Sequence, residues 1–222
     1  MAVILVLCTF LVFIVIDTIL SRRKAALPVA VHAEEEKAAS SGSFVEGFLV
    51  PEQLRYHAGH SWLLRERKNV MRVGVDEFAA ALLGRVEKLE LPKPGHWVRQ
   101  GQRALGFLRG DQKAEMVSPI EGEVVEVNTE VLNDPSLLRK DPYGKGWLMT
   151  VFAPDEESTG RNLLPANLVH GWMRDAVQRL YGMQPELAGA VAADGGRPAA
   201  DLSVAFPTKR WSELTAEFFL TR

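Results

Sequence analysis

Two short segments with the same pattern lie within Leu91–Val151, and they constrain the fold of this chain more than any other feature. The first segment opens on Pro94-Gly95 and the second on Ser118-Pro119, and in each a turn precedes a short alternation of apolar residues. This pattern is typical of a strand, a tight turn and a second strand. Between the segments, the polar residues 109–113 include a glycine that can adopt positive φ, which predicts an exposed hairpin tip. Two similar half-units around such a tip predict a flattened barrel-sandwich.

Four blocks of sequence, in order along the chain, carry a resemblance to a known family. They are Tyr56–Trp62, Val73–Gly84, Gly122–Asn128 and Asp141–Leu148. The first block is similar to an opening His-Glu-Trp signature, and the last two are the most specific. Together they resemble the H protein of the glycine cleavage system, a lipoyl-carrying domain, from Tyr56 to about Val151. The resemblance implies a mainly β fold with peripheral helices, a barrel-sandwich hybrid of the lipoyl type, and a carrier rather than an enzyme.

The sequence departs from this family at the hairpin tip. H proteins present a lysine for lipoate in a Glu-Ser-Val-Lys tetrapeptide. Counting forward from Gly101 or back from Ser118-Pro119 places Leu108–Asp111 at those four positions. Asp111 therefore occupies the position of the lipoyl lysine, and a carboxylate cannot form an amide bond that requires a primary amine. Lys113 is the nearest amine, about 6–7 Å further along an extended strand.

These features lead to one leading hypothesis and two alternatives for the function. The leading hypothesis is an H-protein-like domain that has lost the lipoyl site, carries no cofactor and acts as a binding or scaffolding module for an unknown protein partner. The main alternative is a lipoyl carrier of the glycine cleavage system, or of a related lipoate-dependent pathway, modified at Lys113. The third is a small ligand held at the tip by Arg109 and Asp111, and no motif supports it.

The N-terminal segment predicts a membrane anchor. Residues 2–20 are apolar apart from two threonines and Asp17. A helix of this length would span about 28 Å, close to the thickness of the bilayer core. Basic residues follow the run at Arg22-Arg23-Lys24 and none precedes it, which favours an uncleaved single-pass anchor in the inner membrane, with the rest of the chain in the cytoplasm. A cleaved signal peptide is the alternative, because Val31-His32-Ala33 resembles a cleavage site.

The composition divides the chain into four parts. Residues 1–24 form the anchor and its basic stop. Residues 25–43 are rich in Ala, Glu and Ser and predict a flexible tether. Residues 44–154 form the H-protein-like domain. Residues 155–222 predict a C-terminal helical extension, in which apolar residues recur at helical spacing from Leu168 to Leu180 and a final apolar segment can dock back onto the domain.

Composition and motifs argue against several other functions. The net charge of −2 argues against a nucleic-acid-binding surface. The lone cysteine, Cys8, excludes an internal disulfide and a Cys-based zinc site. His57 and His60 have no Cys or carboxylate ligands close by in the sequence, so they predict packing rather than metal binding. No nucleophile with an adjacent base and no phosphate-binding loop occurs, so the chain is not expected to be an enzyme.

Three residues are candidates for partner binding. Trp97 follows the Pro94-Gly95 turn, where it could contact a partner or cover the open end of a small barrel, and the sequence favours neither. Arg109 belongs to the predicted tip. Trp172 lies in the C-terminal extension, whose helix is expected to pack on the barrel or on a partner.

Overall fold

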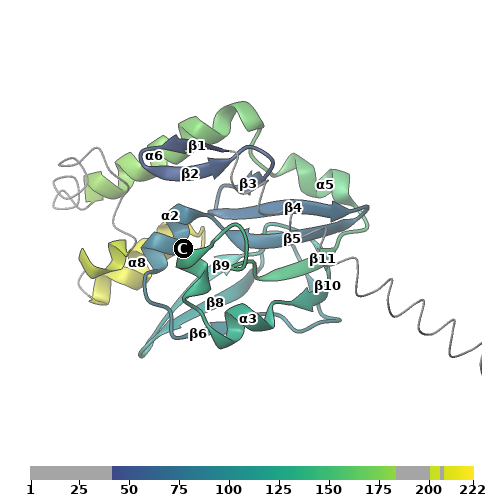
Figure 1. Ribbon diagram of the computed structural model, residues 1–222, viewed down its shortest axis with the longest axis horizontal. Coiled ribbons are helices and arrows are strands. Elements are labelled where there is room, and N and C mark those ends of the chain that lie inside the picture. Colours follow the sequence, from purple (N-terminus) through teal and green to yellow (C-terminus); the bar gives the residue numbers. More distant parts are fainter. Residues whose placement is uncertain (1–41, 184–200, 206–207) are drawn as a thin grey trace, which may run out of the picture. The chain divides into compact units, whose positions relative to one another are not determined.

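The computed structural model describes residues 42–183, 201–205 and 208–222 (Figure 1). The predicted anchor and almost all of the predicted tether lie outside these residues, so both stay predictions. Within the described ranges, no helix is long and apolar enough to cross a membrane.

The described residues form three antiparallel sheets. The largest has six strands in the order β3-β4-β5-β11-β10-β7, the second has the order β6-β8-β9, and β1 pairs with β2. The strands are β1 (Gly42–Val45), β2 (Phe48–Pro51), β3 (Arg55–His57), β4 (Ser61–Arg67), β5 (Val70–Val75), β6 (Lys88–Glu90), β7 (Trp97–Val98), β8 (Arg103–Arg109), β9 (Gln112–Val117), β10 (Gly122–Val127) and β11 (Met149–Phe152). This mainly β architecture agrees with the fold predicted from the sequence.

Short helices surround the sheets. They are α2 (Glu77–Leu83), α3 (Thr129–Asn133), α4 (Leu137–Lys140), α5 (Glu156–Arg161), α6 (Val169–Met183) and α8 (Thr208–Phe218), with the 3-10 turns η1 (Ala166–Leu168) and η2 (Leu202–Ala205). Helix α2 begins after Asp76, whose side chain accepts a hydrogen bond from the Ala79 N–H, and it ends at Gly84 with φ 63°. A short acceptor side chain before the first turn and a left-handed glycine after the last one are the usual signals for these two ends.

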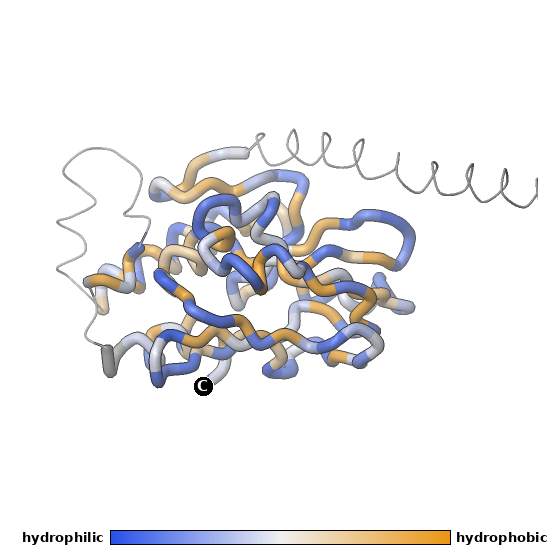
Figure 2. The backbone as a smooth tube through the Cα atoms, turned by 60° about the horizontal axis from the view of Figure 1, so that its bottom comes forward, coloured by the Kyte–Doolittle hydropathy of each residue, from blue (hydrophilic) through white to orange (hydrophobic). Residues whose placement is uncertain are grey.

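Residues alternate between the core and solvent along β10, near one edge of the six-stranded sheet. Val73, Val124 and Val151 on three adjacent strands are fully buried, whereas Glu123, next to Val124, is exposed. In Figure 2, hydrophobic and hydrophilic stretches follow one another along the backbone. Because successive side chains of a strand point to opposite faces, β10 has one face in the core and the other in solvent, whereas the central strands β5 and β11 are buried on both faces over most of their length.

Helix α6 confirms the helical pattern predicted for the C-terminal extension. Its buried residues are Val169, Met173, Ala176, Val177 and Leu180. The helix lies beside β1, where the Ser43 hydroxyl and His170 Nε2 are 2.8 Å apart. The apolar stripe therefore packs within the chain. Packing against the sheets is the common source of stability for a helix of this length.

The two histidines near the start of the domain are packing residues, as predicted. His60 is fully buried, and its ring lies 4.4 Å from the rings of both Phe78 and Trp172. Its Nδ1 is 2.8 Å from the Asp76 carboxylate. His57 is also buried, and its Nδ1 accepts a hydrogen bond from the Gly59 N–H. Among the described residues, no group of three metal-ligating side chains occurs.

The buried His57 predicts a loss of stability in mild acid. Burial lowers the pKa of His57, and the neighbouring His60 lowers it further. The unfolded chain, with a histidine pKa of about 6.5, therefore takes up this proton at higher pH than the folded chain does. The contribution of neutral His57 is complete above about pH 6.5 and is lost as the pH falls below that value. We expect His57→Asn, which retains an acceptor, to flatten this decline.

The measurement is the free energy of unfolding from urea titrations between about pH 7 and pH 5, a range that brackets the ordinary histidine pKa. His96→Asn is the matched control, because His96 is exposed. Equal pH dependence in the wild type and in His57→Asn would show that His57 does not contribute.

Candidate functional site

The predicted hairpin tip is present between β8 and β9. Arg109 pairs with Gln112, which leaves Gly110 and Asp111 as the two turn residues. Gly110 has φ 54°, whereas Asp111 does not have positive φ. A positive φ at the first central residue alone is the pattern of a type II′ turn, which suits the twist of a two-residue hairpin. The sequence thus correctly located both the hairpin and its glycine.

Asp111 is exposed at this turn, at the position where the sequence pattern places the lipoyl lysine. Its side chain ends in a carboxylate, which lacks the primary amine needed for an amide bond to lipoate. The residue at the tip therefore does not fit the cofactor.

Lys113, the nearest amine, lies on β9 and pairs across the hairpin with Leu108. Its Nζ is 2.9 Å from the Glu90 carboxylate and 3.2 Å from the Glu115 carboxylate. Both hydrogen bonds raise the pKa of Lys113, and the one to Glu90 has the larger effect. Only the neutral amine is a nucleophile, so both contacts oppose acylation at this site.

Arg109 is held against the chain's own C-terminal segment. Its Nη1 is 2.7 Å from the Ser203 hydroxyl, and its guanidinium lies 5.9 Å from the centre of the Trp211 ring. On the other side of the hairpin, the Gly110 N–H donates to the Glu87 carboxylate over 3.2 Å. The base of the tip is thus attached to two other parts of the fold.

Residues 201–205 and 208–222 dock onto β9, α2 and the hairpin, as the apolar composition of this segment predicted. The indole N–H of Trp211 donates to the Leu82 carbonyl over 3.1 Å, and the Phe219 ring lies 6.4 Å from Phe107. At the chain end, the Thr221 hydroxyl lies 3.4 Å from the Glu115 carbonyl. Helices α2 and α8 gather with β9 at one end of the domain (Figure 1). The attachment of Arg109 to this segment had no signal in the sequence, because the two parts are about ninety residues apart.

The other two candidate partner-binding residues differ in exposure. Trp97 is 51% exposed on the edge strand β7, so about half of its surface is available to a partner. Trp172 is half-buried against the His60 ring, although one of its edges lines a shallow groove on α6 beside Leu168. Of the three candidates, Trp97 has the most exposed side chain.

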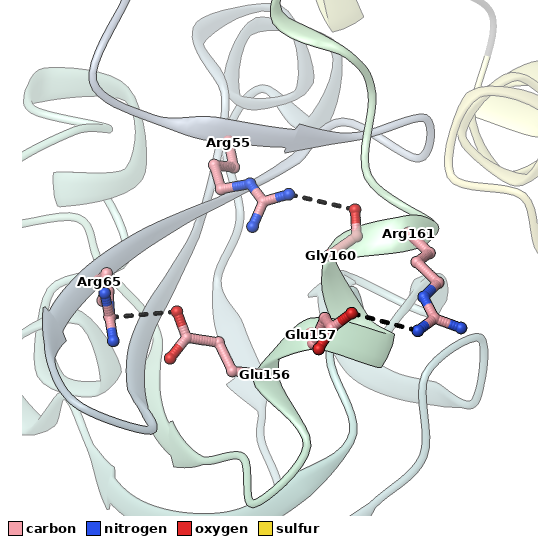
Figure 3. Close-up of a pocket in the computed structure, with 6 residues that line it drawn as sticks. All are labelled: Arg55, Arg65, Glu156, Glu157, Gly160 and Arg161. Carbon is pink, nitrogen blue, oxygen red and sulfur yellow. Dashed lines mark hydrogen bonds and ion pairs between the residues drawn. The ribbon is translucent and has the colours of Figure 1, made fainter.

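A hollow between β3, β4 and α5 contains three arginines (Figure 3). It is lined by Arg55, Arg65, Glu156, Glu157, Gly160 and Arg161. Arg65 pairs with Glu156 at 3.1 Å, and Arg55 donates to the Gly160 carbonyl over 3.1 Å. These contacts attach α5 to the sheet. Exposed ion pairs of this kind contribute little to stability, and the hollow contains no nucleophile and base pair.

Comparison with known proteins identifies the family. A model of the glycine cleavage H-protein family matches residues 54–175, which is more than half of the chain. This chain belongs to the glycine cleavage H-protein family. The H protein of Streptomyces coelicolor is 40% identical over 106 residues, covering 48% of this chain and 85% of the relative. The H protein of Mycobacterium leprae is 35% identical over 126 residues, covering 55% and 95%.

Among solved structures, an H protein from Mycobacterium marinum is 30% identical, with a TM-score of 0.44 over 47% of this chain and 87% of that one. Members of this family are carriers and not catalysts. The family match ends at residue 175, within α6, so the segment that docks on the hairpin lies outside it.

Proposed function

We propose that this chain is a non-lipoylated member of the H-protein family that acts as a binding or scaffolding module. The observation that carries the proposal is Asp111 at the exposed turn of the β8–β9 hairpin, where acceptor chemistry requires an amine. The contacts of Arg109 with Ser203 and Trp211 also support it, because they hold the base of the tip on the protein's own surface. A hairpin attached in this way suits recognition by a partner better than it suits the presentation of a mobile lipoyl-lysine side chain.

The test is the intact mass of the full-length protein purified from its own cells, with peptide mapping across residues 109–117. We expect no lipoyl group in cells whose other lipoyl proteins are modified, and those proteins serve as the internal control. A lipoyl group anywhere in the mapped peptide would overturn the proposal.

A lipoyl carrier modified at Lys113 is the second candidate function. It is favoured by the exposure of the Lys113 side chain, which is 45% accessible, and by the names of the relatives. The same mass measurement separates the two functions. If the wild type carried lipoate and Lys113→Arg did not, the chain would be a carrier with a displaced acceptor.

We further propose that residues 1–24 anchor the module at the cytoplasmic face of the inner membrane. The apolar run and the basic residues that follow it support this placement. Fractionation of cells should recover the full chain with the membranes. Protease added to intact spheroplasts should leave the folded domain uncut, and its digestion there would contradict the proposed orientation.

A further inference from the structure

Five charged side chains on and beside the six-stranded sheet are segregated by sign. Arg67 and Lys68 lie at the turn between β4 and β5, whereas Glu121, Glu123 and Glu126 lie on or just before β10. All five are exposed, and none of them forms an ion pair within the part of the chain that the structure describes. By contrast, the nearby Arg72 already pairs with Glu66. These five charges therefore make the turn between β4 and β5 basic and the exposed side of β10 acidic.

Strand register places the ends of this charge pattern in a single row with apolar residues between them. The row crosses five strands through residues that lie directly opposite each other. Arg67 is opposite Val70, Val70 is opposite Phe152, Phe152 is opposite Glu123, and Glu123 is opposite Trp97. Side chains that are directly opposite in an antiparallel sheet share a face. Phe152 and Trp97 are 40% and 51% exposed, and Arg67 and Glu123 are exposed as well, so these four side chains meet solvent. Val70, in the middle of the row, is only 5% exposed.

We propose that this face is a dimer interface, and that its occupant is a second copy of the same chain. The row is basic on β4, apolar on β5 and β11, and acidic on β10, so it is self-complementary about a line between β5 and β11. With strands about 4.8 Å apart, Arg67 and Glu123 each lie on a strand about 7 Å from that line. A two-fold axis along the line stacks two copies face to face, with Arg67 of each copy over Glu123 of the other.

The same axis makes further favourable contacts. It places the exposed Phe152 of each copy over strand β5 of the other, at the position of the buried Val70, and it brings Lys68 close to Glu121. Each contact occurs twice, as an isologous interface requires, and the assembly closes at two subunits. A uniformly basic or acidic partner would satisfy only one half of the face and would be repelled by the other half. The mirrored placement of the two signs therefore favours a second copy over a partner of one charge.

Charge reversal tests this interface in the full-length chain, purified in mild detergent and measured by light scattering and native mass spectrometry. We expect the wild type to form dimers that weaken as salt increases. Arg67→Glu and Glu123→Arg should each raise the dissociation constant at least about tenfold, since each places like charges together twice. An equimolar mixture of the two variants should recover the dimer, because both of its charge contacts are then attractive.

The matched controls are Arg85→Glu and Glu52→Arg, which reverse exposed charges away from this face and should leave the dimer unchanged. A wild type that is monomeric at every attainable concentration would overturn the proposal. A dimer that survives both single reversals, or a mixture of the two variants that fails to dimerise, would overturn it as well. Any association through the N-terminal anchor is common to all variants and therefore cannot produce the rescue by mixing.

Discussion

Replacing Asp111 with lysine is expected to convert an unmodified chain into a lipoylated one. The turn formed by Gly110 and Asp111 is exposed, and a side chain at position 111 extends from the hairpin without losing any hydrogen bond of the described structure. Since the missing amine is the chemical obstacle, supplying it at the family's acceptor position should restore the substrate of a lipoyl ligase. The measurement is intact mass and peptide mapping after expression in a lipoylating host.

Asp111→Arg is the matched control, because it introduces the same charge without an amine that can be acylated. The lipoyl group in Asp111→Lys should map to position 111 and should remain when Lys113 is also changed to arginine. An unmodified Asp111→Lys chain, in cells whose other lipoyl proteins are modified, would show that more than one residue separates this hairpin from a ligase substrate.

Trp211→Ala is expected to cause the largest loss of stability of any single change discussed here. Trp211 is 1% exposed, its indole N–H binds the Leu82 carbonyl, and its ring faces the Arg109 guanidinium. Removal of a buried tryptophan side chain typically costs about 3–5 kcal/mol, because it leaves a cavity in addition to the lost transfer energy. The Leu82 carbonyl would also lose its donor.

The free energy of unfolding from urea titrations checks this prediction. Trp211→Phe should cost less, since it retains most of the buried ring and loses mainly the hydrogen bond. Trp97→Ala is the control for the loss of an indole, because that side chain is half-exposed on an edge strand. A small effect of Trp211→Ala would mean that the C-terminal segment is not part of the cooperative fold.

Local patterns were sufficient for much of the fold. The Pro/Gly turns, the strand alternation and the glycine at position 110 predicted the hairpin, since each depends on residues only a few positions apart. Apolar residues at helical spacing between Val75 and Leu83 also indicate a helix, and α2 (Glu77–Leu83) begins two residues after the start of that pattern. The stripe around Met173 and Leu180 likewise predicted α6.

Contacts between distant parts of the chain could not be predicted in this way. Nothing near Arg109 in the sequence indicates that it binds Ser203, and nothing near Trp97 indicates that it shares a sheet face with Phe152. Whether Glu123 forms an ion pair also depends on which distant side chains the fold brings to its surface. Such features depend on strand order and helix docking, and many sequences with the same local pattern could differ in them.

The sequence by itself determined the family, the hairpin and the replacement of the lipoyl lysine by Asp111, because these depend on residue identity at counted positions. Only the tertiary structure decided the environment of that hairpin. It placed Lys113 between two carboxylates, attached Arg109 to the C-terminal segment, and arranged free charges of opposite sign across one sheet face. The reason is physical: chemical identity is carried by single residues, whereas charge pairing and burial arise only when distant segments are brought together.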